Sequence, residues 1–315
     1  MDVLVIGGAD VERLLDPDAL VDALADAFAA LSDGRMDAPP RNQVTAPAGF
    51  LLAMPAHRPG GPIGVKLVSV FEGNRERGIP SHLALVALFD EETGAPIALM
   101  DGASITAART AGAAALSARL LARPDSRVLA IVGAGVQGRA HLAALARVRP
   151  IEEIRVASLY PEEAAALAAT DPRARAVGTI AEAVAGADIV ALCTNSPSPV
   201  IDAAWVAPGA HVTSVGYHPP AGELPPALAA AAHLFVETRA AFEPVPVGCG
   251  ELAGLDPATG TELGEVVLGR RPGRTNEGEV TVYKAMGHAV EDLAAGTLVL
   301  AAARATGTGS TVSLS

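Results

Sequence analysis

Three glycines in the middle of the sequence have the spacing of a turn that binds a phosphate group. Gly133, Gly135 and Gly138 follow an apolar, β-branched run at 128–132 and precede a helix-forming run at 140–148. The first glycine permits a sharp turn, the second lets an anion approach the backbone, and the third lets the helix pack closely on the strand. The N–H groups and the positive dipole at the start of that helix then face the anion. The alternative is an ordinary glycine turn, but the flanking runs favour dinucleotide binding.

Lys66 is a cation in an apolar setting. It lies in a predicted strand at 63–71, on the face that it shares with Val68 and Val70. We expect its ammonium to be partly desolvated there, which would suit contact with an anion. The alternative is a lysine at a sheet edge that extends its charge into water.

Arg109 is a second cation in an unfavourable place. It lies near the first turn of a predicted helix of small residues at 104–121, where the helix dipole disfavours positive charge. A bound carboxylate between the arginine and the helix N-terminus would remove this conflict, and a guanidinium can hold it bidentately. The alternative is an internal ion pair with Asp101 or with another acid.

The N-terminal part of the chain is predicted to contain helices and a sheet that position these cations. One helix begins after Asp16, which caps it with Pro17 at its first position, and ends at Gly34. Apolar runs predict strands at 3–6, 50–54, 63–71, 83–89 and 96–100. The strand at 83–89 is apolar on both faces and should therefore be central in its sheet.

A change of pattern near Arg123 indicates the start of a second domain. Beyond it we predict strands at 128–132, 154–159, 176–177, 188–193, 211–215 and 234–237. We also predict a short helix at 180–185 and a long helix from Tyr283 to Arg304 that ends near Gly307. The fold class is therefore α/β, with a Rossmann dinucleotide-binding domain.

The expected ribose-binding position does not decide between NAD and NADP. In this fold an acid that binds the ribose hydroxyls falls about 20 residues beyond the glycines. Here Ser158, Leu159 and Tyr160 occupy that region, without the acid that favours NAD or an arginine for a 2′-phosphate. We expect Ser158 to lie at the ribose, and the preference between NAD and NADP stays open.

Composition excludes several classes of partner. The formal net charge of −12 argues against binding nucleic acid or an anionic membrane surface. The two cysteines, Cys193 and Cys249, have no metal-ligand spacing, so we expect no metal site, and they fit a reducing cytoplasm. No signal peptide or run of about 20 apolar residues is evident, so a cytoplasmic location is expected.

Several blocks across most of the chain resemble the ornithine cyclodeaminase/μ-crystallin family. The combination of the RTA helix, the GAGVQ turn and the closing GHAVED is specific. The matching blocks are MPA at 54–56, GVKLVS at 64–69, IPSH at 79–82, LMDG at 99–102, ITAARTA at 105–111, VGAGVQG at 132–138, EAVAGAD at 182–188, WVAPGAH at 205–211 and YKAMGHAVED at 283–292.

The resemblance implies a two-domain subunit and a set of site residues. A discontinuous α+β substrate and dimerisation domain would comprise 1–122 completed by 285–315, and the Rossmann domain would comprise 123–284. The implied groups for the substrate carboxylate are Arg41, Lys66 and Arg109, and the implied catalytic groups near the reacting carbon are Lys66 and His82. The implied cofactor contacts are Ser81, Thr110, Gly133, Ala134, Gly135, Val136, Gln137, Gly138, Ser158, Thr194 and Val215.

One departure from the family pattern bears on the reaction. Cyclodeaminases have an acid in a VGAD motif after the strand at 211–215, whereas this chain has Tyr217 and His218 in that region. The acidic stretch after the next strand is also altered, and whether Tyr217, His218 or Glu243 replaces the acid stays open.

The resemblance and this departure favour an NAD(P)H-dependent reductase of small α-imino acids, or the reverse amino-acid dehydrogenase, acting as a homodimer. The first alternative is a cyclodeaminase-type lyase that recycles bound NAD. The second is a crystallin-like protein that binds small ligands without catalysis. The substrate side chain is not predicted.

Overall fold

The structure is a computed structural model that describes residues 1–314, apart from the side chain of Arg75. It divides into two compact units, the first comprising Met1–Arg109 with His288–Ser315 and the second comprising Thr110–Gly287. The sequence placed the first boundary later, at 122/123. The division falls earlier because α3 (Gly102–Leu121) is one unbroken helix, and its end packs through Ala118 in a core of the second unit.

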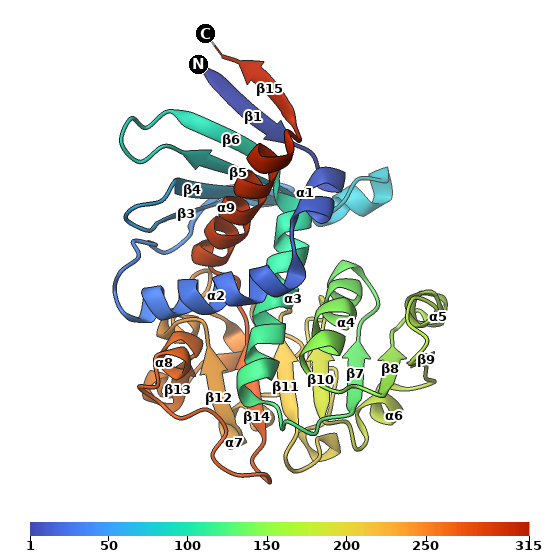
Figure 1. The fold of residues 1–315 in the computed structure, drawn as a ribbon. Helices are drawn as coiled ribbons and strands as arrows, with labels where there is room; N and C mark the ends of the chain where they lie inside the picture. Colours follow the sequence, from blue (N-terminus) through green and yellow to red (C-terminus); the bar gives the residue numbers. More distant parts are fainter. Residues whose placement is uncertain (315) are drawn as a thin grey trace. The chain divides into compact units, whose positions relative to one another are not determined.

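The first unit is built on a seven-stranded sheet in which the β1–β6 pair is parallel and the other described pairs are antiparallel. The terminal strands β1 and β15 pair with each other, so both ends of the described chain lie at one edge of this sheet (Figure 1). The predicted central strand β5 lies between β6 and β4. In sheet order the strands are β15 (Ser310–Ser313), β1 (Asp2–Ile6), β6 (Pro96–Asp101), β5 (His82–Phe89), β4 (Ile63–Val70), β3 (Gly49–His57) and β2 (Asn42–Ala46).

Helices α1 (Gly8–Leu14), α2 (Pro17–Ser32) and α9 (Ala289–Thr306) complete the first unit with the short η1 (Glu72–Arg77). Helix α9 packs against α2 and against strands β3, β4 and β5. The Asp16 carboxylate accepts hydrogen bonds from the backbone N–H groups of the first turn of α2, as its sequence predicts.

The predicted helix from Tyr283 to Arg304 is wrong at its start. Residues Thr281–Lys284 form strand β14 in the second unit, and the helix α9 begins only at Ala289. The reason is tertiary: β14 is hydrogen-bonded between β11 and β12, which overrides the helical continuation suggested by the sequence. The end of the helix is correct, because Gly307 adopts the left-handed conformation that closes it.

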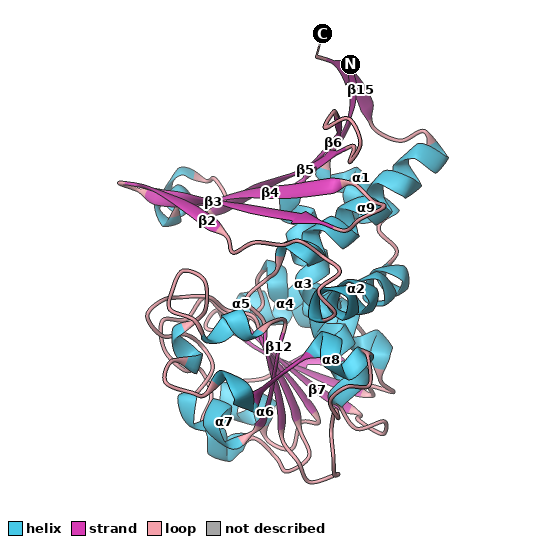
Figure 2. Ribbon diagram, turned by 90° about the vertical axis from the view of Figure 1, so that its left-hand side faces the viewer, coloured by secondary structure: helices cyan, strands magenta, loops and turns pink. Residues whose placement is uncertain are grey.

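The second unit is built on an eight-stranded sheet in which all the described pairs are parallel, and Figure 2 shows its strands fanned by the twist of the sheet. The order β9-β8-β7-β10-β11 is that of the Rossmann fold, with the switch between β7 and β10. Strands β13 and β14 were not predicted. In sheet order the strands are β13 (Gly260–Glu262), β12 (His233–Val236), β14 (Thr281–Lys284), β11 (His211–Ser214), β10 (Ile189–Leu192), β7 (Val128–Val132), β8 (Glu153–Ala157) and β9 (Ala174–Ala176).

Both faces of this parallel sheet are buried, so alternate residues of one strand enter different cores. Leu129 and Ile131 of β7 pack with α4 (Val136–Val148) and α5 (Pro161–Ala168). Ala130 and Val132 enter the other core, with α6 (Ile180–Val184) and α7 (Pro226–Ala231). The remaining helical segments of the unit are α8 (Leu263–Val267), η2 (Ala203–Trp205), η3 (Arg239–Phe242), η4 (Gly250–Leu252) and η5 (Pro257–Thr259).

Among residues 1–314, no helix combines the length and the apolar character that a membrane crossing requires.

Candidate active site

The glycine turn has the geometry that its spacing predicts. Gly133 has a φ of +100°, and a Cβ on it would lie 2.6 Å from the carbonyl oxygen of Cys193. A Cβ on Gly138 would collide with the carbonyl oxygen of Gly133, so only glycine lets the helix approach the turn. At Gly135, which is the N-cap of α4, a Cβ would meet no atom within 4 Å. The turn is therefore tight on two sides and open on the third, where a pyrophosphate would fit against the helix N-terminus.

The other expected cofactor positions of the second unit lie at the same edge of its sheet. Ser158 follows β8, Thr194 comes shortly after β10, and Val215 follows β11. Because these strands are parallel to β7, their carboxyl ends meet at the edge that also carries the glycine turn 133–138. Thr110, the remaining expected cofactor contact of this unit, lies in α3 and is buried.

In the first unit, Lys66 and Arg109 form a buried cluster with two acidic side chains from the start of α9. The Lys66 ammonium lies 2.8 Å from Asp292 Oδ2. The Arg109 guanidinium donates to Asp292 Oδ1 and to Glu291 Oε2, both at 3.0 Å. All four side chains are at most 6% exposed. The cluster joins β4, α3 and α9, three segments that are distant in sequence.

The structure differs from the expectation that Arg109 lies near the first turn of its helix. The helix α3 begins at Gly102, so Arg109 lies two turns inside it and not near its first turn. Its charge is already compensated by internal carboxylates, which was the alternative reading. A position near a helix start therefore does not by itself require a bound anion.

Lys66 does not extend to water, because it is only 3% exposed and faces α9. Burial, and after it the charge of Arg109, lower the pKa of its ammonium to about 8, while Asp292 and Glu291 act in the opposite direction. An amine with this pKa exchanges its proton readily near neutral pH. Such a group is suited to general acid–base chemistry.

His288 is a member of the cluster that the sequence reasoning missed. It caps α9 and forms a capping box with Glu291. Burial lowers its pKa to about 4, and the charges of Arg41, Arg109 and Lys66 contribute to the shift, so the imidazole is neutral at pH 7. The pattern His-x-x-Glu is a signal for this helix start, although the run from Tyr283 predicts the interior of a longer helix here.

Arg41 is a third cation near the cluster. Arg41 lies close enough to His288 to influence its protonation, so it belongs to the same group. Three cations (Arg41, Lys66 and Arg109) therefore lie near His288, two of them paired with Glu291 and Asp292. Guanidinium and ammonium groups gathered in this way are suited to binding a carboxylate.

Ser81 and His82 do not adjoin Lys66. His82 is opposite Val70 in the β4–β5 register, on the same face as Lys66 but four residues along the strand, which is about 13 Å. Its Nδ1 lies 3.1 Å from Ser81 Oγ. His82 therefore does not contact Lys66 directly, and its expected catalytic role stays a prediction.

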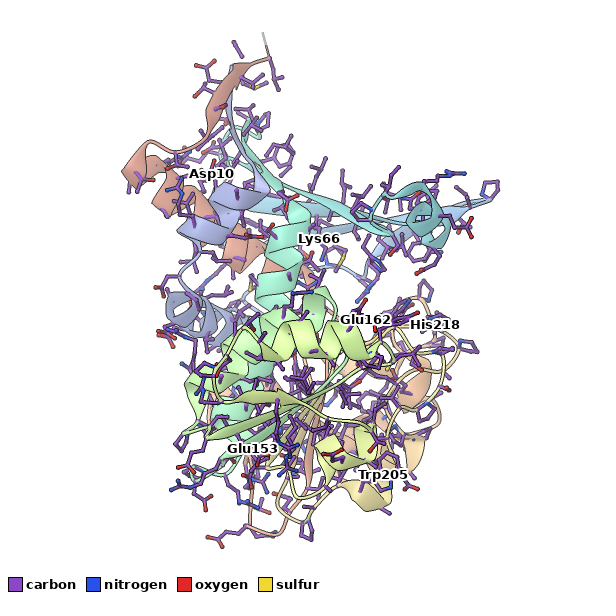
Figure 3. All side chains as sticks on the ribbon, turned by 90° about the vertical axis from the view of Figure 1, so that its right-hand side faces the viewer. Asp10, Lys66, Glu153, Glu162, Trp205 and His218 are labelled. Atoms are coloured by element: carbon purple, nitrogen blue, oxygen red, sulfur yellow. The ribbon has the colours of Figure 1, made fainter. Side chains whose placement is uncertain are left out.

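The loop that lacks the cyclodeaminase acid lies beside the end of β10. His218 Nδ1 is 3.4 Å from Asn195 Oδ1, and the Tyr217 hydroxyl donates to the carbonyl oxygen of Pro246 at 3.5 Å. Figure 3 labels His218 in this loop and Lys66 on its own sheet. Glu243 is exposed in a separate segment that follows η3.

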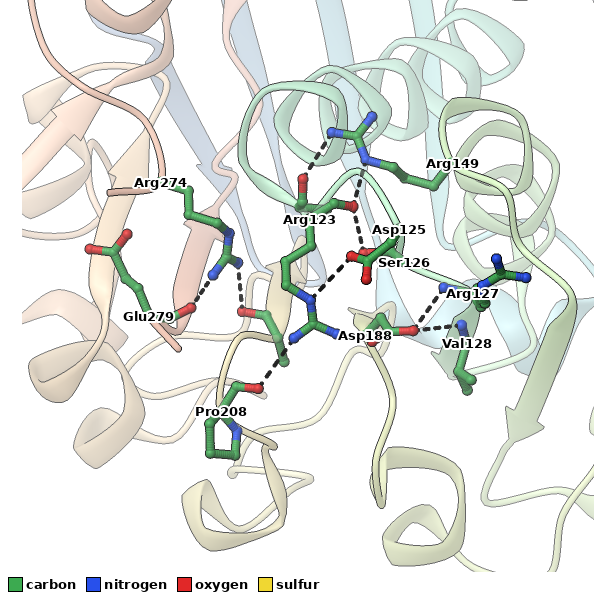
Figure 4. A network of polar contacts seen from close by, with 12 residues as sticks. Arg123, Asp125, Ser126, Arg127, Val128, Arg149, Asp188, Pro208, Arg274 and Glu279 are labelled. Carbon is green, nitrogen blue, oxygen red and sulfur yellow. Dashed lines mark hydrogen bonds and ion pairs between the residues drawn. The ribbon is translucent and has the colours of Figure 1, made fainter. Parts of the chain in front are cut away.

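A hollow of about 750 Å³ at the opposite, amino edge of the parallel sheet is not the candidate site. Its arginines have structural partners (Figure 4). Arg123 pairs with Asp188, and Asp188 also accepts from the backbone of β7. Arg274 donates to main-chain carbonyls, including that of Leu121 at 2.6 Å. Among the residues described, no group of three His, Cys, Asp or Glu side chains could hold a metal ion.

Comparison with known proteins identifies relatives along nearly the whole chain. The model of the ornithine cyclodeaminase/mu-crystallin family matches residues 2–307. Ketimine reductase mu-crystallin from Mus musculus is 39% identical over 254 residues, 80% of this chain and 80% of that protein.

Two solved structures share the fold. Delta(1)-pyrroline-2-carboxylate reductase from Thermococcus litoralis, in complex with NADH and L-proline, has a TM-score of 0.91 and 32% identity, over 98% of this chain and 100% of that one. An archaeal alanine dehydrogenase dimer with bound NAD has a TM-score of 0.91 and 29% identity, over 100% of both chains. The Rossmann-type unit and the matched blocks agree with these findings, and the chain belongs to the ornithine cyclodeaminase/mu-crystallin family.

Proposed function

We propose that this protein reduces a small α-imino acid with NAD(P)H, at a C=N carbon that bears a carboxylate. The chain is an NAD(P)-dependent oxidoreductase, as its relatives are. When bound, the cofactor supplies the hydride, and the open side of the turn at Gly135 is where its pyrophosphate would be held. Relatives named ketimine reductase and pyrroline-2-carboxylate reductase support the imine as substrate class.

The observation that carries the proposal is the buried Lys66 with a pKa of about 8. An imine accepts hydride more readily when its nitrogen is protonated, so a proton donor of this strength is needed beside it. The Lys66 ammonium would give one proton to the imine nitrogen and become a neutral amine. Asp292, at 2.8 Å, holds the amine in place.

The substrate carboxylate would be bound by the cationic side chains of the same cluster. Glu291 and Asp292 hold Arg109 rigidly through two hydrogen bonds of 3.0 Å, so the guanidinium loses little freedom on binding. Arg41 is the third cation of this group, and its charge reaches the same place, since it acts on His288. We therefore assign Arg41, Lys66 and Arg109 to the carboxylate and Lys66 also to the proton.

An assay of net redox change tests this function against its two alternatives. A panel of cyclic ketimines for reduction and of L-amino acids for oxidation should be tested with NAD(H) and NADP(H). Stoichiometric consumption of reduced cofactor by a ketimine acid is the expected result. Release of ammonia from a diamino acid without net change in cofactor would replace the reductase with a lyase. Binding without turnover across the panel would leave a ligand-binding protein.

A dimer is proposed for the same protein, because the face of the first sheet opposite α9 is apolar and exposed. Leu85 is 48% exposed and pairs in register with Leu67 on β4, and Leu83 and Leu51 extend the same surface. An area of this kind is typical of an interface. A second copy is the expected occupant, since the archaeal alanine dehydrogenase is a dimer. A monomer in sedimentation at micromolar concentration would contradict this assignment, and Leu85→Lys should weaken the dimer.

A further inference from the structure

A second cluster of buried charges lies in the second unit and has no role in the function proposed so far. Its members are Glu223, Glu251 and Lys284, which are 0%, 4% and 0% exposed. Burying three charged side chains is costly unless each is paired and hydrogen-bonded. The hydrogen bonds and ion pairs of these three side chains must therefore offset the cost of removing them from water.

Glu223 is hydrogen-bonded on both carboxylate oxygens by two separate loops. Oε2 accepts from the backbone N–H and the hydroxyl of Thr194, at 2.6 and 2.7 Å, in the loop after β10. Oε1 accepts from the Ser214 hydroxyl at the end of β11, at 3.0 Å, and from the backbone N–H groups of Val215 and Gly216, at 3.0 and 2.7 Å. One carboxylate thus fixes the carboxyl ends of two neighbouring strands to each other.

Lys284 and Glu251 complete the cluster from two other segments. Lys284 Nζ lies 2.6 Å from Glu251 Oε2 and donates to the Gly216 carbonyl at 2.6 Å. It also donates to Ser214 Oγ at 3.2 Å, and Glu251 accepts from the backbone N–H of Leu224 at 2.9 Å. The hydroxyl of Ser214 therefore connects the lysine to Glu223. Each charge is bound, and the loop after β11 is held from both sides.

The position of the cluster relates it to one half of a dinucleotide site. In a Rossmann sheet the adenosine half lies over the first three strands, here β7, β8 and β9, and the nicotinamide half lies over the following ones. Strands β10 and β11, whose ends Glu223 joins, belong to this second half. The glycine turn, which would hold the pyrophosphate, belongs to β7 and α4.

We propose that Glu223 is a positioning residue for the nicotinamide half of the cofactor site. It sets the loops at Thr194 and Val215 so that their backbone and side chains form a fixed surface for the nicotinamide ring. Lys284 and Glu251 keep the Glu223 carboxylate and the Gly216 carbonyl in place. This inference rests on the cofactor use in the proposed function, but not on the identity of the imine.

The test compares NADH with ADP-ribose, which lacks the nicotinamide, as ligands of the full-length protein in calorimetry. In Glu223→Gln the amide nitrogen faces N–H and O–H donors, so one loop loses its acceptor. We expect NADH affinity to fall about tenfold or more, and ADP-ribose affinity to change less than about twofold. A merely structural glutamate would lower both affinities together or only the melting temperature, and either result would overturn the proposal.

Two further variants keep the test decisive. Glu237→Gln is the matched control. Like Glu223, Glu237 is buried, at 2% exposed, and its carboxylate accepts hydrogen bonds from backbone N–H groups, those of Met286 and Gly287. Unlike Glu223, it follows β12 and does not join β10 to β11. This variant should lower stability without changing the ratio of NADH to ADP-ribose affinity, and an equal change in that ratio would overturn the proposal.

If Glu223→Gln does not fold, Ser214→Ala is the second variant, since it removes one hydrogen bond of the same carboxylate at a fully buried position. We expect the ratio of NADH to ADP-ribose affinity to fall in this variant too, but by less. An unchanged ratio in this variant would refute the proposal. A wild type that binds NADH but reduces no imine would refute the proposed function and leave this inference standing.

Discussion

Replacing Arg109 with methionine should separate its role in substrate binding from its role in the fold. The side chain donates two hydrogen bonds, to Asp292 and Glu291, both at 3.0 Å, in a cluster that is almost fully buried. Methionine fills a similar volume but cannot bind a carboxylate. In the variant, Lys66 remains as a cationic partner of Asp292.

The magnitudes follow from these contacts. A buried hydrogen bond to a charged group contributes about 1.5–3 kcal/mol, so kcat/KM for an imino acid should fall about tenfold to 150-fold. Breaking a buried ion pair on one side costs about 3–5 kcal/mol of stability, because the remaining carboxylates are then undercompensated. The pKa of Lys66 should rise, since the charge of Arg109 is the second cause of its lowering.

The assay uses one imine substrate with its carboxylate and one in which a neutral amide replaces that group. The wild type should strongly prefer the acid, and Arg109→Met should lose most of that preference. The alkaline limb of the kcat profile, near pH 8 in the wild type if it reports Lys66, should move to higher pH. Arg119→Met, at an exposed position in the last turn of the same helix, should change neither property.

Two results would refute the reasoning. If the wild type and Arg109→Met discriminate equally between acid and amide, Arg109 does not bind the substrate carboxylate. If discrimination is lost while the alkaline limb stays where it is, the cluster binds substrate but Lys66 does not supply the proton.

Other consequences can be measured independently. Gly135→Leu should abolish nicotinamide nucleotide binding in calorimetry while the circular dichroism spectrum is unchanged, because the open side of the turn is filled. Ser158→Asp should raise the ratio of kcat/KM for NAD over NADP, because a carboxylate after β8 would repel a 2′-phosphate; an unchanged ratio would remove Ser158 from the ribose. The pKa of Lys66 is about 8 in the fold and 10.5 ordinarily, so the unfolded chain binds this proton more tightly. The free energy of unfolding in urea should therefore gain a rising contribution between about pH 8 and 10.5, which Lys66→Met removes.

The parts of this protein that could be predicted from sequence are those that depend on near neighbours in the chain. The turn at 133–138 is one, because the strand, the glycines and the helix adjoin, Gly133 has a positive φ, and a Cβ on Gly138 would collide with the carbonyl oxygen of Gly133. The cap at Asp16 is another, since its hydrogen bonds go to residues two and three positions ahead. Lys66 and Arg109 could be recognised as unusual, because an isolated charge in an apolar pattern needs a partner.

The identity of those partners was decided only by the tertiary structure. Arg109 contacts Glu291 and Asp292 across 182 and 183 residues, a separation that no local pattern encodes. The predicted start of α9 is wrong for the same reason. Thr281–Lys284 form a strand because they are hydrogen-bonded between β11 and β12. Glu223 gave no signal in the sequence, since its two loops meet only when β10 and β11 pair. Charged groups are placed in these cores by partners from distant segments, and the fold alone brings those segments together.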